Sequence, residues 1–194
     1  MDWERTGALK QDVVWEEWLR GRAFTLRSTW GLFSPKRVDE GSRLLIDHLE
    51  VPAGGLGLDL GCGYGVIGLA LAHLCPAGQV HLVDKDFVAV EYARKNAALN
   101  GLTNCTAYLS NGFSHVPTLR FDVITSNLPA KAGAEMLSIL LADARDHLQP
   151  GGRLYVVALS GLKEYVKRCF RELFGNYEKV KQGKTYTVAL AIRS

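Results

Sequence analysis

The chain has 194 residues, of which 47% are hydrophobic and 22% are charged, and its formal net charge is +3. These values are ordinary for a soluble globular protein, and the length suits one well-buried domain and is short for two. The small positive charge permits a nucleic-acid partner without indicating one. No apolar run could span a bilayer and the N-terminus is unlike a signal peptide, so we expect a cytoplasmic protein without a membrane partner.

The N-terminal part of the chain predicts a β-hairpin. Residues 13–19 and 23–30 have the composition of two strands, and a short turn containing a glycine separates them. A Ser-Pro pair then breaks the pattern before the first predicted helix. We therefore expect residues 1–37 to form an N-terminal hairpin extension and residues 38–194 to form the main domain.

Predicted helices and strands alternate along the rest of the chain. This alternation predicts an α/β fold with a doubly wound, mostly parallel seven-stranded sheet and helices on both faces. A short turn joins the last two strands, so we expect the final strand to run antiparallel. The predicted helices cover residues 39–49, 66–74, 87–100, 132–148 and 161–174, and the strands cover residues 56–60, 79–83, 105–109, 121–126, 153–159, 177–180 and 185–192.

A glycine-dense loop follows the first strand of the main domain. Asp59 ends the apolar run, and Gly61, Gly63 and Gly65 follow before a helical pattern begins. Strand, glycine loop and helix is the arrangement that brings backbone N–H groups against a nucleotide-like ligand. The order D-x-G-x-G-x-G, in place of G-x-G-x-x-G, favours S-adenosylmethionine over a dinucleotide. The alternative is a tight structural turn.

Two further polar residues follow predicted strands. Asp84 ends the second strand of the main domain, where a carboxylate can accept both hydroxyl protons of a ribose. Asp86 is the competing carboxylate, but its position suits the cap of the next helix. Asn111 follows the third strand, where its amide could pair with an adenine edge or belong to an ordinary turn. The ribose argument fits a nicotinamide cofactor equally well.

The fourth strand ends in Asn127-Leu128-Pro129-Ala130. An Asn side-chain oxygen and a neighbouring backbone carbonyl can together hold a planar amine by its N–H groups. Pro129 favours an extended conformation at Leu128 and so fixes where that carbonyl points. The alternative is a plain strand-ending turn.

Cysteine and histidine spacing predicts no metal site. The four cysteines include no C-x-x-C pair, which is the usual spacing for zinc or a redox pair. The five histidines are scattered along the chain, and none stands beside a recognisable nucleophile. The cysteine positions are Cys62, Cys75, Cys105 and Cys169.

Four segments resemble motifs of the class I S-adenosylmethionine-dependent methyltransferases: DLGCGYGVIG, VDKD, SNLPA and LQPGGRLYVV. Longer segments are similar to the RsmC-type small-subunit ribosomal RNA guanine-N2 methyltransferases, namely LFSPKRVDEGSRLLIDHL, SNGFSHV, FDVITSNLPAKAG and NYEKVKQGKTYTVALA. The resemblance extends from about Phe33 to near the C-terminus, with the motifs in matching order and spacing. It implies a Rossmann-like fold, S-adenosylmethionine as cofactor and a ribosomal RNA substrate.

The resemblance also implies roles for individual residues. The glycine loop would hold the methionine part of the cofactor, with a ribose site and an adenine site on the next two strands. The strand-ending Asn motif would hold the target amine. The implied cofactor-binding residues are Asp59, Gly61, Gly63, Gly65, Asp84 and Asn111, and the implied catalytic residues are Asn127, Leu128 and Pro129.

The chain departs from the family pattern in the amine-binding motif. Leu128 replaces the family's first proline, and Ala130 replaces an aromatic residue that stacks on the substrate base. Phe33, Tyr64 or Trp30 could supply a ring, or each could simply pack. RsmC-type proteins also carry two related domains, whereas this chain has room for one.

The N-terminal hairpin has two interpretations. Its tryptophans and arginines could form an RNA-contacting surface, or the hairpin could be an extra ribbon packed on the domain. The residues concerned are Trp15, Trp18, Arg20, Arg22 and Arg27.

Other functions stay open on the sequence alone. The methyl acceptor could be a glutamine side chain in a protein or a small molecule in place of RNA. A chain with an altered substrate motif could also be a non-catalytic cofactor-binding or RNA-binding module. A nicotinamide oxidoreductase is the weakest alternative, because the G-x-G-x-x-G fingerprint is missing.

Overall fold

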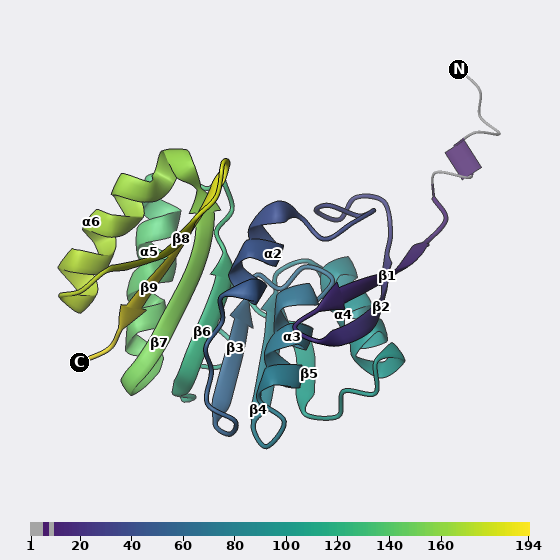
Figure 1. The fold of residues 1–194 in the computed structure, drawn as a ribbon, viewed down its shortest axis with the longest axis horizontal. Coiled ribbons are helices and arrows are strands. Elements are labelled where there is room, and N and C mark those ends of the chain that lie inside the picture. The colour runs from purple at the N-terminus through teal and green to yellow at the C-terminus, as the bar shows by residue number, and fades with distance from the viewer. Residues whose placement is uncertain (1–5, 8–9) are drawn as a thin grey trace.

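A seven-stranded sheet forms the centre of the computed structural model, which describes residues 6–7 and 10–194. The strand order is β5-β4-β3-β6-β7-β9-β8, and helices cover both faces (Figure 1). The strands are β3 (Leu56–Leu60), β4 (Gln79–Asp84), β5 (Cys105–Leu109), β6 (Phe121–Asn127), β7 (Leu148–Leu159), β8 (Glu178–Gln182) and β9 (Tyr186–Ile192). The helices are α2 (Glu40–Asp47), α3 (Val66–Leu74), α4 (Phe87–Leu99), α5 (Ala134–Asp146) and α6 (Lys163–Phe174).

The pairing of the strands confirms the predicted sheet. β3 pairs in parallel with β4 and β6, and β9 pairs antiparallel with both β7 and β8. The chain leaves β3 in one direction through β4 and β5, then returns to β3's other side as β6. The strand order therefore reverses between β3 and β6, and ligands of such sheets bind at the carboxyl ends beside this point.

Three predicted boundaries were wrong around α5 and β7. The predicted helix over residues 132–148 is shorter at both ends, and β7 begins at Leu148 where a helix end was expected. The Ala132 N–H donates to the Pro129 carbonyl in a turn, so α5 starts later. Leu148 is fully buried and pairs with Phe121 of β6. An apolar residue at this spacing fits a helix as well as a strand, which is why the pattern misplaced it.

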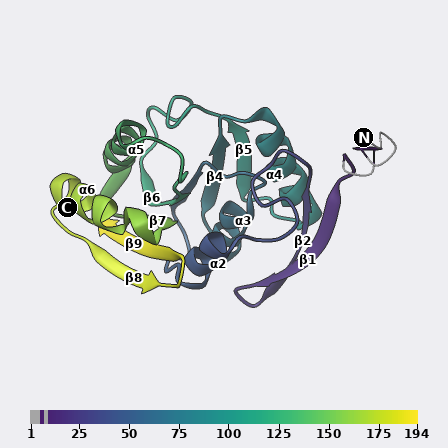
Figure 2. The same cartoon turned by 90° about the horizontal axis from the view of Figure 1, so that it is seen from above.

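The helices divide between the two faces of the sheet. α2, α3 and α4 pack on one face in a single apolar cluster, and α5 and α6 pack on the other face in a second cluster. Figure 2 shows α5 and α6 on the opposite side of the sheet from α2 and the N-terminal hairpin. The strands are consequently buried on both faces, as expected for a parallel sheet.

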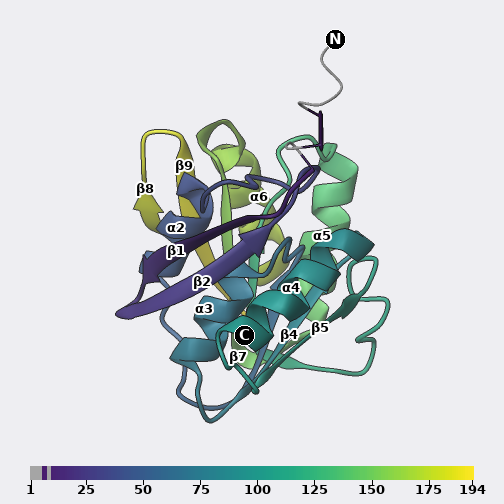
Figure 3. The ribbon, with the colours of Figure 1, turned by 90° about the vertical axis from the view of Figure 1, so that its right-hand side faces the viewer.

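The predicted N-terminal hairpin is present as β1 (Val13–Leu19) and β2 (Arg22–Ser28), which pair antiparallel. Figure 3 shows the hairpin lying across the helices α3 and α4. Phe24 and Leu26 of β2 are fully buried in the cluster that contains α2, α3 and α4. Part of the predicted extension, residues 1–5 and 8–9, lies outside the described residues, and the division at residue 37 stays a prediction.

The hairpin arginines make contacts within the chain. Arg20 donates from Nη1 to the carbonyl oxygens of Ile46 and Leu49, at 3.0 and 2.9 Å, and so satisfies carbonyls at the end of α2. Arg22 donates to the Asn100 carbonyl, and Arg27 lies 3.8 Å from a carboxylate. These contacts favour the packed ribbon over the RNA-contacting surface for the three arginines.

Candidate cofactor and substrate site

The candidate site lies where three neighbouring strands end at the carboxyl edge of the sheet. Asp59 lies on β3, Asp84 ends β4 and Asn127 ends β6. β3 sits between the other two strands, and Asp59 is paired in register with Leu82 and Thr125. The fold therefore brings together three polar residues that are far apart in the sequence.

The glycine loop between β3 and α3 leaves its backbone open to a ligand. Gly61 and Gly63 have φ of 73° and 55°, in the left-handed region that favours glycine. A Cβ atom added at either glycine would meet nothing within 4 Å, so free space adjoins the backbone there. At Gly65 an added Cβ would lie 3.1 Å from the Ala93 Cβ, so this glycine permits close packing on α4.

The side chain of Asp59 contacts the helix that follows the glycine loop. Asp59 is 1% exposed, and it accepts hydrogen bonds from the Gly68 N–H (2.8 Å) and the Thr125 hydroxyl (3.2 Å). The carboxyl group thus links β3 to the first turn of α3 and to β6. Burial raises the pKa of Asp59 to about 7, although these hydrogen bonds act in the opposite direction.

This pKa shift predicts a pH dependence of stability. The folded state holds the Asp59 proton more tightly than the unfolded chain, where an aspartate titrates near ~3.9. The resulting stabilisation is present below about pH 4 and is lost as the pH rises through about 7. We expect Asp59→Asn to reduce the fall in the free energy of unfolding between about pH 5 and pH 8, as measured by urea denaturation. An equally steep fall in the variant would contradict the assignment.

Asp84 contacts the glycine loop, whereas Asp86 caps a helix. Asp84 accepts hydrogen bonds from the Gly63 N–H (2.9 Å) and the Asp86 N–H (3.0 Å). Asp86 accepts from the Val88 N–H at 2.8 Å, and this contact confirms its predicted role as the N-cap of α4. Of the two competing carboxylates, Asp84 is therefore the one beside the loop.

Asn111 lies just beyond β5, on the far side of β4 from the glycine loop. It is exposed, and its backbone N–H donates to the Ser114 hydroxyl at 3.2 Å. The preceding residue, Ser110, donates its N–H to the Asp84 carbonyl at 2.9 Å. Asn111 consequently lies next to the end of β4, and its adenine-binding role stays a prediction.

Asn127 is fixed by hydrogen bonds from its side-chain nitrogen. Nδ2 donates to Asp39 Oδ2 at 3.0 Å and to Ser42 Oγ at 3.1 Å. Both amide protons are therefore used within the protein, which leaves the carbonyl oxygen Oδ1 as the group able to accept a hydrogen bond from a substrate.

Leu128 is accommodated by the sheet and the core. Its N–H donates to the Val157 carbonyl at 2.9 Å, which extends the pairing of β6 with β7. A proline at this position would lack that N–H. The side chain is 4% exposed and packs in the cluster of α5 and α6. The departure from the family pattern thus adds a backbone hydrogen bond and apolar burial.

The three rings proposed as replacements for the missing aromatic differ in exposure. Tyr64 is buried, lies edge-on to Trp15 with a centroid distance of 5.8 Å, and donates its hydroxyl proton to the Arg37 carbonyl at 3.2 Å. Phe33 and Trp30 are 67% and 61% exposed. Tyr64 is therefore a packing residue, which was one of its two interpretations from the sequence. Of these three rings, Phe33 and Trp30 stay available for stacking on a substrate base.

Three residues near Asn127 were not predicted as site residues. Asp39 and Ser42 at the start of α2 contact its amide, and the ring of Tyr186 at the start of β9 lies on the same turn of α2. The sequence does contain a signal for Asp39, because an aspartate before an amphipathic run is typical of a helix N-cap. Its contact with a residue 88 positions away requires the tertiary structure.

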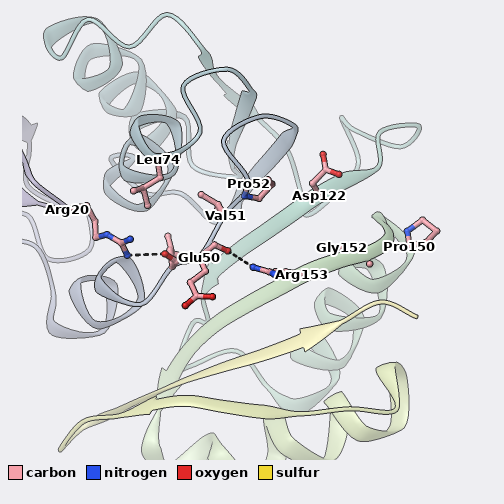
Figure 4. Close-up of a pocket in the computed structure, with 11 residues that line it drawn as sticks. Arg20, Glu50, Val51, Pro52, Leu74, Asp122, Pro150, Gly152 and Arg153 are labelled. Atoms are coloured by element: carbon pink, nitrogen blue, oxygen red, sulfur yellow. Dashed lines mark hydrogen bonds between the residues drawn. The ribbon is translucent and has the colours of Figure 1, made fainter.

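A cavity of about 610 Å³ lies at the opposite edge of the sheet, near the starts of β3, β6 and β7 (Figure 4). Arg20, Glu50, Asp122 and Arg153 are among its lining residues, and Arg153 donates to the Glu50 carbonyl at 3.0 Å. None of the predicted site residues lines this cavity. We therefore do not assign it to the cofactor or the substrate.

The described part of the chain contains no cluster of three or more His, Cys, Asp or Glu side chains suited to a metal ion. In the same residues, no helix has the length and apolar character needed to cross a membrane. All four cysteines are free in the structure.

Comparison with protein-family models gives a match to the methyltransferase small domain over residues 23–190. The protein YbxB of Bacillus subtilis is 37% identical over 193 residues, which cover 97% of this chain and 95% of that protein. Ribosomal RNA small subunit methyltransferase C of Hamiltonella defensa is 34% identical over 191 residues, which cover 94% of this chain and 56% of that protein. The chain thus spans about half the length of this RNA methyltransferase and nearly all of YbxB.

Solved structures share the fold. The 16S rRNA N2 methyltransferase RsmC of T. Thermophilus, determined in complex with AdoMet and guanosine, superposes with a TM-score of 0.85 at 28% identity. That match covers 94% of this chain and 51% of the RsmC chain. A ribosomal protein methylase from Lactobacillus delbrueckii, at 22% identity and a TM-score of 0.67, shows the fold alone. The Rossmann-like methyltransferase fold is confirmed, and with the family model matching residues 23–190 the chain belongs to the methyltransferase small domain family.

Proposed function

We propose that the chain is an S-adenosylmethionine-dependent methyltransferase that methylates an exocyclic nitrogen of guanine in ribosomal RNA. The main observation behind this proposal is that two hydrogen bonds from Nδ2 hold the side-chain amide of Asn127 in place. Its Oδ1 is left for a substrate, at the same edge of the sheet as the glycine loop. Relatives named as ribosomal RNA methyltransferases, and an RsmC structure with guanosine, support the choice of RNA. We expect the protein to act in the cytoplasm.

The residues present fit S-adenosylmethionine. The open backbone at Gly61 and Gly63 would receive its methionine part, next to the N-terminus of α3, whose N-cap residue Gly65 makes no side-chain hydrogen bond to the helix. A helix N-terminus favours a carboxylate. Asp84 would accept hydrogen bonds from the ribose hydroxyls, and Asn111 would contact the adenine. Bound at this site, the cofactor supplies an electrophilic methyl group carried on a sulfonium.

Catalysis by this chain consists chiefly of positioning. Asn127 Oδ1 and the Leu128 carbonyl would accept hydrogen bonds from the guanine amine and so aim its lone pair at the methyl carbon. The proton that the amine loses on methylation would pass to water. Such alignment contributes up to ~7–11 kcal/mol in ideal cases. The same oxygens offset the positive charge that develops on the nitrogen.

The proposal is tested by offering different methyl acceptors. The protein is incubated with labelled S-adenosylmethionine and, separately, with naked RNA, small ribosomal subunits or a protein extract from methylation-deficient cells. We expect label in RNA. Label in protein would show a different acceptor, and cofactor binding without any label would support a non-catalytic module.

A further inference from the structure

We propose that Asp39 at the start of α2, together with Ser42, is the positioning group that sets which end of the Asn127 amide faces the substrate. The inference rests on the proposed function for its consequence in methyl transfer, whereas the orientation itself can be tested without activity. Figure 1 shows α2 lying over the sheet near the ends of β3 and β6. Residues 88 positions apart are thereby joined in one site.

The chemistry of Asp39 dictates the orientation. An ionised carboxylate has only acceptor oxygens, so the amide group facing it must present Nδ2 and not Oδ1. The Asn127 Nδ2 lies 3.0 Å from Asp39 Oδ2 and 3.1 Å from Ser42 Oγ, which gives each amide proton an acceptor. The carbonyl oxygen must then point to the other side. If the Asn127 amide were flipped, its N–H groups would face the N–H groups of the substrate amine, and no hydrogen bond could form between them.

Asp39 is itself held rigidly. As the N-cap of α2, its carboxylate accepts hydrogen bonds from the Gly41 N–H at 2.8 Å and the Ser42 N–H at 3.1 Å. The residue is buried, with 9% of its surface exposed. Because Asp39 caps α2 and also contacts Asn127, the amide of Asn127 is held in a fixed position relative to α2.

Tyr186, at the start of β9, lies close to Asp39. Burial raises the pKa of Tyr186, and the nearby carboxylate of Asp39 acts in the same direction. A Cβ atom added at Gly41 would lie 2.8 Å from Tyr186 Cδ1, which shows how closely the ring sits on α2. Asp39 therefore receives donors from α2 and β6, and the Tyr186 ring of β9 packs against the turn of α2 that holds it.

The first test measures coupling between Asp39 and Asn127 in methyl transfer. Asp39→Ser keeps a good helix cap but is too short to reach Asn127, and Ser42→Ala removes only the second acceptor. We expect Asp39→Ser to lower kcat about 10- to 100-fold, with S-adenosylmethionine affinity within about twofold of wild type. In an Asn127→Ala background the same change should have no further effect, because the group it orients is gone. Equal losses in both backgrounds would overturn the proposal.

The matched control is Glu40→Ser, which makes the same carboxylate-to-hydroxyl change at an exposed neighbour in the first turn of α2. We expect kcat in this variant to match wild type. A loss as large as that of Asp39→Ser would assign the effect to the charge or stability of α2 and overturn the proposal.

A second measurement reads the orientation without activity. The ¹⁵N-labelled side-chain amide of Asn127 is identified by its absence in Asn127→Ala, and the solvent exchange of its protons is followed by NMR. We expect slow exchange in wild type and faster exchange in Asp39→Ser and Ser42→Ala. Fast exchange in wild type would contradict the orientation. Slow exchange in a protein that methylates no RNA would leave the orientation intact and refute only the proposed function.

Discussion

Asn127→Ala is expected to reduce kcat for methyl transfer about 10²–10³-fold, the cost typical of removing one fixed polar group that stabilises developing charge. The substitution removes the oxygen that would accept from the amine. It leaves the glycine loop and the contacts of Asp84 intact, so S-adenosylmethionine affinity should stay within about twofold of wild type. Single-turnover rates and calorimetric titration of the cofactor measure the two quantities separately.

Asn176→Ala is the control for this prediction. Asn176 also makes side-chain hydrogen bonds with backbone groups, including the N–H and carbonyl of Ile192, but it precedes β8, away from the candidate site. We expect this variant to lose stability and keep the wild-type kcat. If Asn127→Ala weakened cofactor binding as much as turnover, Asn127 would have no separate role in holding the amine.

Asp84→Ala is expected to weaken S-adenosylmethionine binding about 100-fold or more. The change removes the proposed acceptor of two ribose hydroxyl protons, and hydrogen bonds to charged groups contribute about 1.5–3 kcal/mol each. It also removes the acceptor of the Gly63 N–H, which holds the loop in place. Isothermal titration calorimetry with the cofactor, before any acceptor is added, measures the loss directly.

Asp86→Ala makes the same chemical change two residues away. Because Asp86 caps α4 through the Val88 N–H, we expect a loss of about 1 kcal/mol in the free energy of unfolding and nearly unchanged cofactor affinity. If Asp84→Ala and Asp86→Ala weakened cofactor binding to a similar extent, the loss of affinity would come from lower stability around the end of β4. It would then not come from a ribose contact at Asp84.

The elements with strong local patterns could be predicted closely from the sequence. β3, α3 and β5 have the predicted bounds, since apolar runs and glycines mark their ends. The junction of α5 and β7 was misplaced because Leu148 fits both periodicities, and only its pairing with Phe121 decides between them. Local pattern located the other elements as well, although β2 and β8 differ by up to two residues from the predicted ranges 23–30 and 177–180.

The candidate site divides in the same way. The glycine loop and Asn127 could be found because parallel strands bring their carboxyl ends together whatever the details of packing. The contacts of Asp39 and Ser42 with Asn127 depend on how α2 lies over the sheet, and no local pattern encodes that. The intramolecular role of Arg20 at the end of α2 was missed for the same reason.

The most direct test of the proposed function is the identity of the methylated nucleoside. Small ribosomal subunits from methylation-deficient cells are incubated with S-adenosylmethionine and either wild-type protein or Asn127→Ala, and the RNA is digested for mass spectrometry. The proposal predicts N2-methylguanosine with the wild type and at least ~100-fold less with the variant. Cofactor-binding wild-type protein that yields no N2-methylguanosine, or equal product from both proteins, would contradict it.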